Sequence, residues 1–197
     1  MPSMPSKTAN PATLQDVIAR FGGAAGEGRK PPVHLWNPPS CGEIDMRIAR
    51  NGAWYYQGSP ISRPAMVRLF SSILRREPDG SYVLVTPVEK CIIRVDDAPF
   101  TAVEMTVSGE GEARLIAFRT NVDDVVPLDS EHPLRVVVNP ETGEPSPYVL
   151  VRDRLEALIL RPVFYQLVEM SEQREEDGRT VLAVRSAGMV FDLGEVA

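Results

Sequence analysis

Apolar residues recur at helical spacing in the stretch that begins at Pro64. One face of this stretch is formed by Met66, Leu69, Phe70, Ile73 and Leu74. This period predicts an amphipathic helix, and we expect it to run until Pro78-Asp79-Gly80, a strong turn sequence. Burial of such a face contributes about 1.5–3 kcal/mol per large side chain, so this helix should supply much of the local core.

Strand patterns flank this helix on both sides. Upstream, Ile44, Met46 and Ile48 alternate with polar residues, Asn51-Gly52 is a hairpin turn, and residues 53–57 return as a strand. Downstream, residues 81–85 and 90–95 are apolar and short. The predicted module is therefore strand–strand–helix–strand–strand.

This pattern occurs twice in the chain. Residues 61–95 align without a gap onto residues 159–193, and ten of the 35 aligned pairs are identical. Segments this similar are expected to fold alike, which indicates two related modules. In the second copy the helix begins at Pro162 with a shorter apolar face, and strands are expected at 180–184 and 189–193.

The remaining segments complete a two-module organisation. Residues 1–32 read as an unstructured tail, a short helix at 11–21 and a linker, followed by modules at 33–97 and 98–197. Between the two copies we expect strands at 100–107, 113–118, 122–126, 134–138, 148–151 and 154–159. The predicted fold class is α+β with mostly antiparallel sheets.

Composition narrows the function classes. The chain has 197 residues, a net charge of -6 and a pI of about 5.1, which argues against binding of duplex nucleic acid. No apolar run approaches the roughly 20 residues of a membrane span, and the first residues do not resemble a secretory signal. We therefore expect a cytoplasmic protein that binds neither nucleic acid nor membrane.

The cysteines and histidines give no metal or catalytic pattern. Cys41 and Cys91 are fifty residues apart, with no second pair to complete a zinc site, and His34 and His132 show no ligand spacing. We expect no metal and no cofactor. For Cys41 the alternatives are a redox-sensitive thiol and a buried, unreactive one, and the absence of basic residues nearby in sequence favours the second.

An arginine precedes the helical proline in both copies. Arg63 and Arg161 are predicted at the helix N-caps, where arginine accepts no hydrogen bond and meets the positive end of the dipole. One explanation is an anion bound by guanidinium and helix amides. The other, which we favour, is a pairing of each arginine with a carboxylate on a neighbouring strand.

The first copy also has a polar loop that the second lacks. Thr86, Glu89 and Lys90 belong to the segment TPVEK, which aligns with VRSAG in the second copy. These three residues are candidate ligand contacts, the alternative being ordinary surface polarity at a strand edge. Trp54 lies in a strand with aromatic residues on both faces, so it either stacks on a ligand or packs in the core, and packing is favoured.

Two acidic pairs are present, at Asp96-Asp97 and Asp123-Asp124. Neither pair has a histidine or third ligand at recognisable spacing, so turn and capping roles are favoured over acid–base chemistry. No nucleophile–base set can be assembled, and we expect the protein not to be an enzyme.

The segment from Leu35 to Leu193 resembles a family of proteobacterial proteins catalogued as domain of unknown function 1285. The marks that carry the resemblance are Trp36-x-Pro38 with Cys41-Gly42, Gly52-x-Trp54, Gly58-x-Pro60-Ile61-x-Arg63, Leu69-Phe70, and Thr86–Lys90 followed by Asp96–Phe100. The resemblance implies a duplicated core and a second module similar to a pleckstrin-homology-type β fold. It also implies a site for a nucleotide-like ligand at the interface of the modules, and a role in signalling.

These observations lead to a hypothesis of a non-catalytic sensor for an anionic, nucleotide-like or phosphorylated molecule. Arg63 and Lys90 would neutralise its charge, Thr86 and Glu89 would bind hydroxyls or amides, and Trp54 would wall the pocket. Arg152 and Glu156 precede the repeated helix and are the expected contacts from the second module. The alternative is a protein–protein interaction module that acts in signalling without a small ligand.

Overall fold

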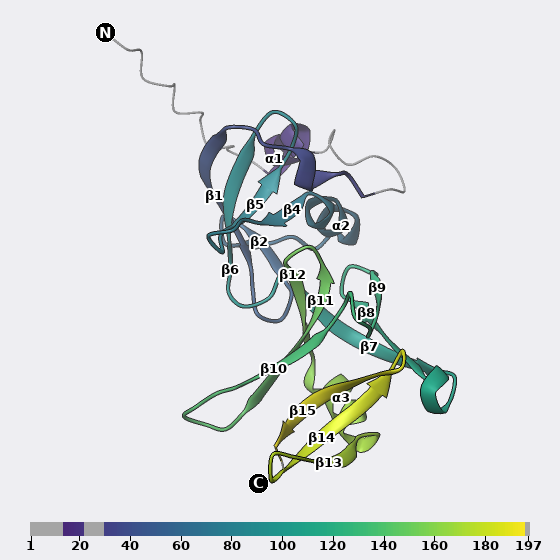
Figure 1. Ribbon diagram of the computed structural model, residues 1–197. Helices are drawn as coiled ribbons and strands as arrows, with labels where there is room; N and C mark the ends of the chain where they lie inside the picture. Colours follow the sequence, from purple (N-terminus) through teal and green to yellow (C-terminus); the bar gives the residue numbers. More distant parts are fainter. Residues whose placement is uncertain (1–13, 22–29, 196–197) are drawn as a thin grey trace. The chain divides into compact units, whose positions relative to one another are not determined.

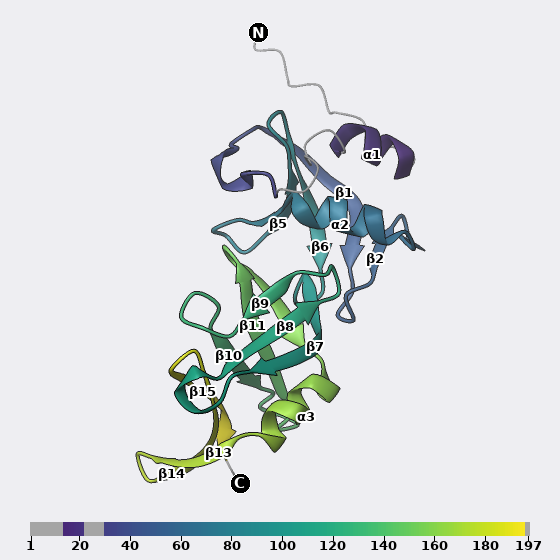
Figure 2. The ribbon, with the colours of Figure 1, turned by 90° about the vertical axis from the view of Figure 1, so that its right-hand side faces the viewer.

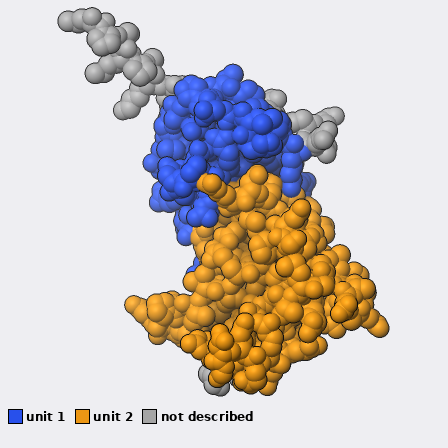
Figure 3. Space-filling view, viewed as in Figure 1, with its two compact units in different colours: residues 1–96 blue, residues 97–197 orange. Residues whose placement is uncertain are grey.

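The computed structural model describes residues 14–21 and 30–195 of the chain (Figure 1). The tail expected at 1–11 and most of the expected linker lie outside these ranges. The chain divides into two compact units, residues 1–96 and 97–197 (Figure 3). No helix within the described ranges combines the length and hydropathy needed to cross a membrane.

The N-terminal unit is built on one six-stranded sheet. Its strands are β1 (Ser40–Ile48), β2 (Trp54–Tyr56), β3 (Ser59–Pro60), β4 (Leu74–Arg76), β5 (Tyr82–Val85) and β6 (Lys90–Val95). They are ordered β3-β2-β1-β6-β5-β4, and β1 and β6 form a parallel pair among otherwise antiparallel neighbours. Two helices, α1 (Leu14–Phe21) and α2 (Pro64–Ser72), and the 3-10 turn η2 (Val33–Leu35) complete the unit.

The core of this unit follows from the predicted strand alternation. Ile44, Met46 and Ile48 on β1 are buried, while the residues between them are exposed. The ring of Trp54 on β2 is stacked on that of Phe70 on α2, with 6.2 Å between centroids, which joins helix to sheet. From α1, the buried residues are Val17 and Phe21.

The C-terminal unit contains two sheets. The larger has the order β10-β11-β12-β7-β8-β9, formed by β7 (Phe100–Ser108), β8 (Leu115–Thr120), β9 (Val125–Pro127), β10 (Leu134–Val138), β11 (Pro145–Arg152) and β12 (Leu155–Ile159). The smaller is β13-β14-β15, formed by β13 (Glu172–Glu176), β14 (Arg179–Ser186) and β15 (Met189–Glu195). Helix α3 (Arg161–Glu169) connects them (Figure 2). The 3-10 turn η3 (Gly111–Ala113) precedes β8.

The duplicated segments keep their local order but join the rest of each unit differently. In both copies a helix is followed by three antiparallel strands, α2-β4-β5-β6 and α3-β13-β14-β15. In the first copy, the parallel pairing of β6 with β1 merges these strands into the six-stranded sheet. In the second copy the three strands form a separate sheet, and the parallel pair is β12 with β7.

The expected end of the helix in the first copy is wrong, and the strand that follows the helix was not predicted in either copy. Helix α2 ends at Ser72, so Ile73 caps it and Leu74 belongs to β4, opposite Leu84. Helix α3 likewise ends at Glu169, before β13. Each unit therefore has one more strand after its helix than the apolar pattern predicted, and Pro78–Gly80 forms the turn between β4 and β5 rather than the helix end.

Candidate functional site

The candidate site is a groove between α1 and the start of α2 in the N-terminal unit. Helix α1 is held there by its buried face, and by an ion pair between Arg20 and the carboxylate of Glu89, the residue before β6. The hydrogen bonds from Arg20 to Glu89 raise the pKa of the Arg20 guanidinium above its ordinary value, because they stabilise the charged form. The helix thereby forms one wall of the groove.

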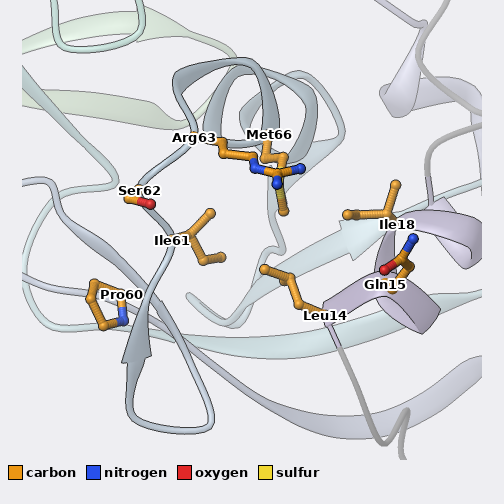
Figure 4. A pocket seen from close by; sticks show the side chains of 8 residues that line it. All are labelled: Leu14, Gln15, Ile18, Pro60, Ile61, Ser62, Arg63 and Met66. Carbon is orange, nitrogen blue, oxygen red and sulfur yellow. The ribbon is translucent and has the colours of Figure 1, made fainter.

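The groove has a volume of about 280 Å³, and its lining combines five apolar with three polar or charged residues. Figure 4 shows Leu14 and Ile18 extending from α1, with Ile61 and Met66 opposite. The other lining residues are Gln15, Pro60, Ser62 and Arg63. A cavity of this size is near the lower end of the range for small-molecule sites, which is about 300–1,000 Å³.

Arg63 supplies the positive charge of this groove. It is exposed, its side chain reaches from the start of α2 toward α1 (Figure 4), and no carboxylate in the described parts of the chain pairs with it. The pairing that we favoured from the sequence is found instead in the second copy, where Arg161 contacts Glu144. Arg161 is also the first residue of α3 rather than its N-cap, which is Leu160.

The helix N-terminus adds few donors beside Arg63. Pro64 has no N–H, and the amides of Met66 and Val67 both donate to the Arg63 carbonyl, at 3.0 and 3.2 Å. A polyphosphate site uses several convergent free amides. The groove is therefore suited to one anionic group attached to an apolar body, rather than to a chain of phosphates.

Thr86, Glu89 and Lys90 are engaged in the structure of their own loop. The Thr86 hydroxyl accepts from the amides of Val88 and Glu89, at 3.3 and 3.2 Å, and the Thr86 amide donates to the Glu89 carbonyl. The Lys90 ammonium lies 3.5 Å from a carboxylate oxygen of Glu77. None of the three lines the groove.

Trp54 is a core residue. It is 1% exposed, and its stacking on Phe70 places the ring inside the unit. A ring this buried offers no face to a ligand. The packing role is what the structure shows, and Trp54 is not among the groove residues.

Arg152 and Glu156 lie in the C-terminal unit and each has a partner of opposite charge. Arg152 donates to Asp124 at 2.8 Å and lies over the Phe100 ring, and its burial lowers the pKa of the guanidinium. Glu156 accepts two hydrogen bonds from Arg135, at 2.6 and 2.7 Å. Of the seven predicted contacts, the structure thus places only Arg63 in the groove.

The carboxylates of the acidic pairs also have partners. Asp96 accepts from Arg47, which lowers the pKa of the Asp96 carboxyl, and Asp123 pairs with Arg119. The Asp97 carboxylate accepts a hydrogen bond from the Tyr148 hydroxyl, at 2.7 Å. These contacts are structural, but they join side chains of different strands and loops and differ from the turn and capping roles that the sequence favoured.

The interpretation of Cys41 as a buried, unreactive thiol is wrong. Cys41 is half-exposed and forms a disulfide with Cys91, with 5.2 Å between their Cα atoms. The strand pairing explains this, since Ser40 is opposite Lys90 and the two cysteines follow directly in parallel strands. The separation of fifty residues concealed the contact, and only the parallel β1–β6 pairing reveals it.

No direct signal in the sequence identifies the apolar part of the groove. Leu14, Ile18 and Met66 fit the apolar faces of two amphipathic helices, a pattern that indicates core. Their partial exposure results from the way α1 lies beside α2. Such packing of distant segments cannot be read from periodicity.

Most of the chain matches the two domains of one protein family. Residues 31–98 match the N-terminal domain of the DUF1285 family, a domain of unknown function, and residues 99–193 match the C-terminal domain. The chain is similar to the crystal structure of a DUF1285 family protein from Silicibacter pomeroyi DSS-3, with 50% identity, a TM-score of 0.84, and coverage of 96% of this chain and 97% of that one. A DUF1285 family protein from Shewanella baltica OS155 is 25% identical, with a TM-score of 0.50 over 64% of this chain and 91% of that one. No curated protein matches the chain.

Proposed function

The chain belongs to the DUF1285 family, whose function is unknown, and we propose that it is a non-catalytic protein that binds a small anionic molecule in the groove beside Arg63. The observation that carries the proposal is an exposed guanidinium, with no carboxylate partner among the described residues, at the edge of a groove whose lining is part apolar and part polar. An arginine in such a place retains its full capacity for a bidentate contact with carboxylate or phosphate. Its counterpart Arg161 is neutralised by Glu144.

The groove supports a particular class of ligand. Five of its eight lining residues are apolar, and one carries a charge. The ligand should therefore have one anionic group and an apolar or aromatic body, with Gln15 and Ser62 available for hydrogen bonds. A nucleoside monophosphate fits this description by chemistry, whereas a dinucleotide has more charge than one guanidinium neutralises.

A signalling role is compatible with this location. Because α1 forms one wall, a ligand that contacts both α1 and α2 binds only when α1 is docked, and it stabilises that state by mass action. The position of α1 would then report occupancy to a partner protein. Such a sensor is the finer part of our proposal, together with a cytoplasmic location.

The second candidate function is a protein–protein interaction module. It is favoured by exposed apolar side chains on the surface of the C-terminal unit, among them Val125, Val137, Val138 and Tyr165. The proposed pleckstrin-homology-type character of residues 98–197 belongs with this alternative, because such folds commonly present binding surfaces.

The test is a thermal-shift screen of the purified protein with small carboxylates, phosphorylated metabolites and nucleotides. A ligand at 100 times its dissociation constant adds about 2.7 kcal/mol of stability. We expect a hit whose effect disappears in R63A and persists in R161A, the matched arginine of the second copy. A hit retained by R63A would exclude the groove, and a panel without any stabilising ligand would favour the interaction module.

A further inference from the structure

The loop that distinguishes the first copy brings two sulfurs and a carboxylate together. Cys41 lies near the start of β1 and Cys91 near the start of β6, and Glu89 directly precedes β6. One ligand atom from each of Cys41, Glu89 and Cys91 lies within 4.8 Å of the other two. This cluster is separate from the groove residues.

The backbone holds Glu89 in this place. Thr86 and Glu89 are joined by the hydrogen bonds of their loop, including the Thr86 amide to the Glu89 carbonyl at 2.9 Å. Arg20 of α1 donates to both carboxylate oxygens of Glu89, which fixes the orientation of the carboxylate. Each oxygen retains a second lone pair for another contact. Arg20 therefore has the position of an outer partner that orients a metal ligand.

The chemistry of the three groups points to a thiophilic cation. Thiolate ligands select ions such as Zn²⁺, which binds sulfur at about 2.3 Å and carboxylate oxygen at about 2.0–2.2 Å. Two sulfurs of a tetrahedral site are then about 3.8 Å apart, so the Cys41 and Cys91 sulfurs have to move apart when the disulfide opens. Because Cys41 is half-exposed, a fourth position remains accessible to water.

We propose that the reduced Cys41–Cys91 pair and Glu89 bind one thiophilic divalent cation, and that the disulfide is the metal-free, oxidised form of the same site. The inference does not depend on the ligand groove. It assigns a function to the polar loop, whose Glu89 and Lys90 align with Ala187-Gly188 of the second copy, and to Cys91, which aligns with Met189. In that copy the loop is a tight turn between β14 and β15, with positive φ at both residues.

The reduction step uses an external dithiol. Its thiolate attacks the half-exposed Cys41 Sγ, the Cys41–Cys91 bond breaks, and Cys91 leaves as a thiolate that takes up a proton. The second thiol of the reductant then displaces Cys41 and closes a cyclic disulfide, so two electrons pass from the dithiol to the protein. Binding of the cation finally releases one proton from each cysteine thiol.

The experiment is a cobalt titration of the full-length protein, reduced and freed of reductant without oxygen. A thiol reagent first verifies two free thiols per chain. We expect thiolate-to-cobalt charge-transfer absorption in the near ultraviolet that saturates at one Co²⁺ per chain and is abolished by Zn²⁺. The oxidised protein and C41S, whose substituted residue is half-exposed and should leave folding intact, are expected to lack this absorption.

Two variants separate the Glu89 ligand from its ion pair. E89Q removes both the ligand and the ion pair and should weaken Co²⁺ binding about 10-fold or more, since even outer-shell partners contribute about 10–100-fold. R20Q breaks the same ion pair but keeps the carboxylate, and should bind Co²⁺ more tightly than E89Q does. Equal affinities of E89Q and wild type would overturn the role of Glu89.

Two free thiols without the charge-transfer absorption would overturn the site itself. R63A should titrate like wild type, so failure of the groove proposal would leave this result unaffected.

Discussion

At the scale of single residues, identical positions in the two copies have acquired different surroundings. Arg63 and Arg161 align with each other in the repeat, yet Arg161 contacts Glu144 whereas Arg63 borders a groove. An ion pair between exposed groups contributes little stability, so Arg161 can be replaced at small cost. The two arginines therefore differ in whether a carboxylate neutralises their charge. For this reason a substitution of Arg161 is a suitable control for the same substitution of Arg63.

Trp54 gives the clearest prediction at this scale. The side chain is 1% exposed and its Nε1 has no acceptor among the described residues. Replacement by alanine leaves a large cavity beside Phe70, so W54A should lose about 3–5 kcal/mol of unfolding free energy in urea denaturation. W54F should lose less, because it keeps a ring against Phe70 and removes a buried donor that has no partner.

A ligand-stacking role for Trp54 would give the opposite pattern. W54A would then unfold at nearly the wild-type urea concentration while losing affinity for any hit in the ligand screen. Tyr55 is the matched control, since it lies on the same strand with its ring partly exposed. Y55A should cost clearly less stability than W54A.

At the scale of elements, the sequence predicted the strands better than the ends of the helices. The apolar period of α2 continues through Ile73 and Leu74, but the helix stops because tertiary pairing takes over. The hydroxyls of Ser71 and Ser72 bond back to the carbonyls of Arg68 and Leu69, at 2.8 and 2.7 Å. Such bonds compete with helix continuation, and Leu74 then finds a partner in Leu84 on β5. A one-dimensional pattern contains no information on that partner.

The same limit applies to the candidate sites. Arg63 could be identified from the repeat, because arginine is unusual at a helix N-cap, where Ser, Thr, Asp and Asn are preferred. The apolar walls of the groove and the pairing of Cys41 with Cys91 depend on which segments become neighbours, α1 with α2 and β1 with β6. Local propensity does not determine those contacts.

The β1–β6 pair also gives a prediction about pH. Asp96 follows β6 and accepts hydrogen bonds from Arg47 on β1, which lowers the pKa of its carboxyl below the usual value of about 3.9. A lowered pKa in the folded state means that the stabilisation is complete above the unfolded-state pKa and is lost as the pH falls through the folded-state value. The difference in unfolding free energy between wild type and D96N should be constant above about pH 5 and should shrink as the pH falls below the unfolded-state pKa of about 3.9 towards the lower folded-state value.

This prediction is checked by urea denaturation across that pH range. A double-mutant cycle with R47Q isolates the pair, and the D96N effect should be lost in the R47Q background. An unchanged D96N effect in that background would mean that another group, such as the nearby Arg94, stabilises the carboxylate.

At the scale of the whole molecule, each unit has its own buried core, and no sheet is shared between the units. In the N-terminal unit the core includes Ile48, Trp54 and Phe70, and in the C-terminal unit it includes Phe100, Phe118 and Leu128. Two units with separate cores are expected to fold as separate domains. Duplication of a helix and three strands was therefore followed by different sheet connections in each unit, not by fusion into one core.

Separate expression of residues 14–96 and 97–197 tests this organisation. Each fragment should show a cooperative unfolding transition by circular dichroism, because neither divides a sheet.

The fragment 14–96 contains all the groove residues together with Cys41, Glu89 and Cys91, so it should retain both proposed binding activities. The fragment 97–197 should show neither, since Arg161 is paired with Glu144 and Met189 stands in place of Cys91. A folded 14–96 fragment that has lost the small ligand but still binds Co²⁺ would mean that the ligand needs residues of the C-terminal unit, while the metal site is complete without them.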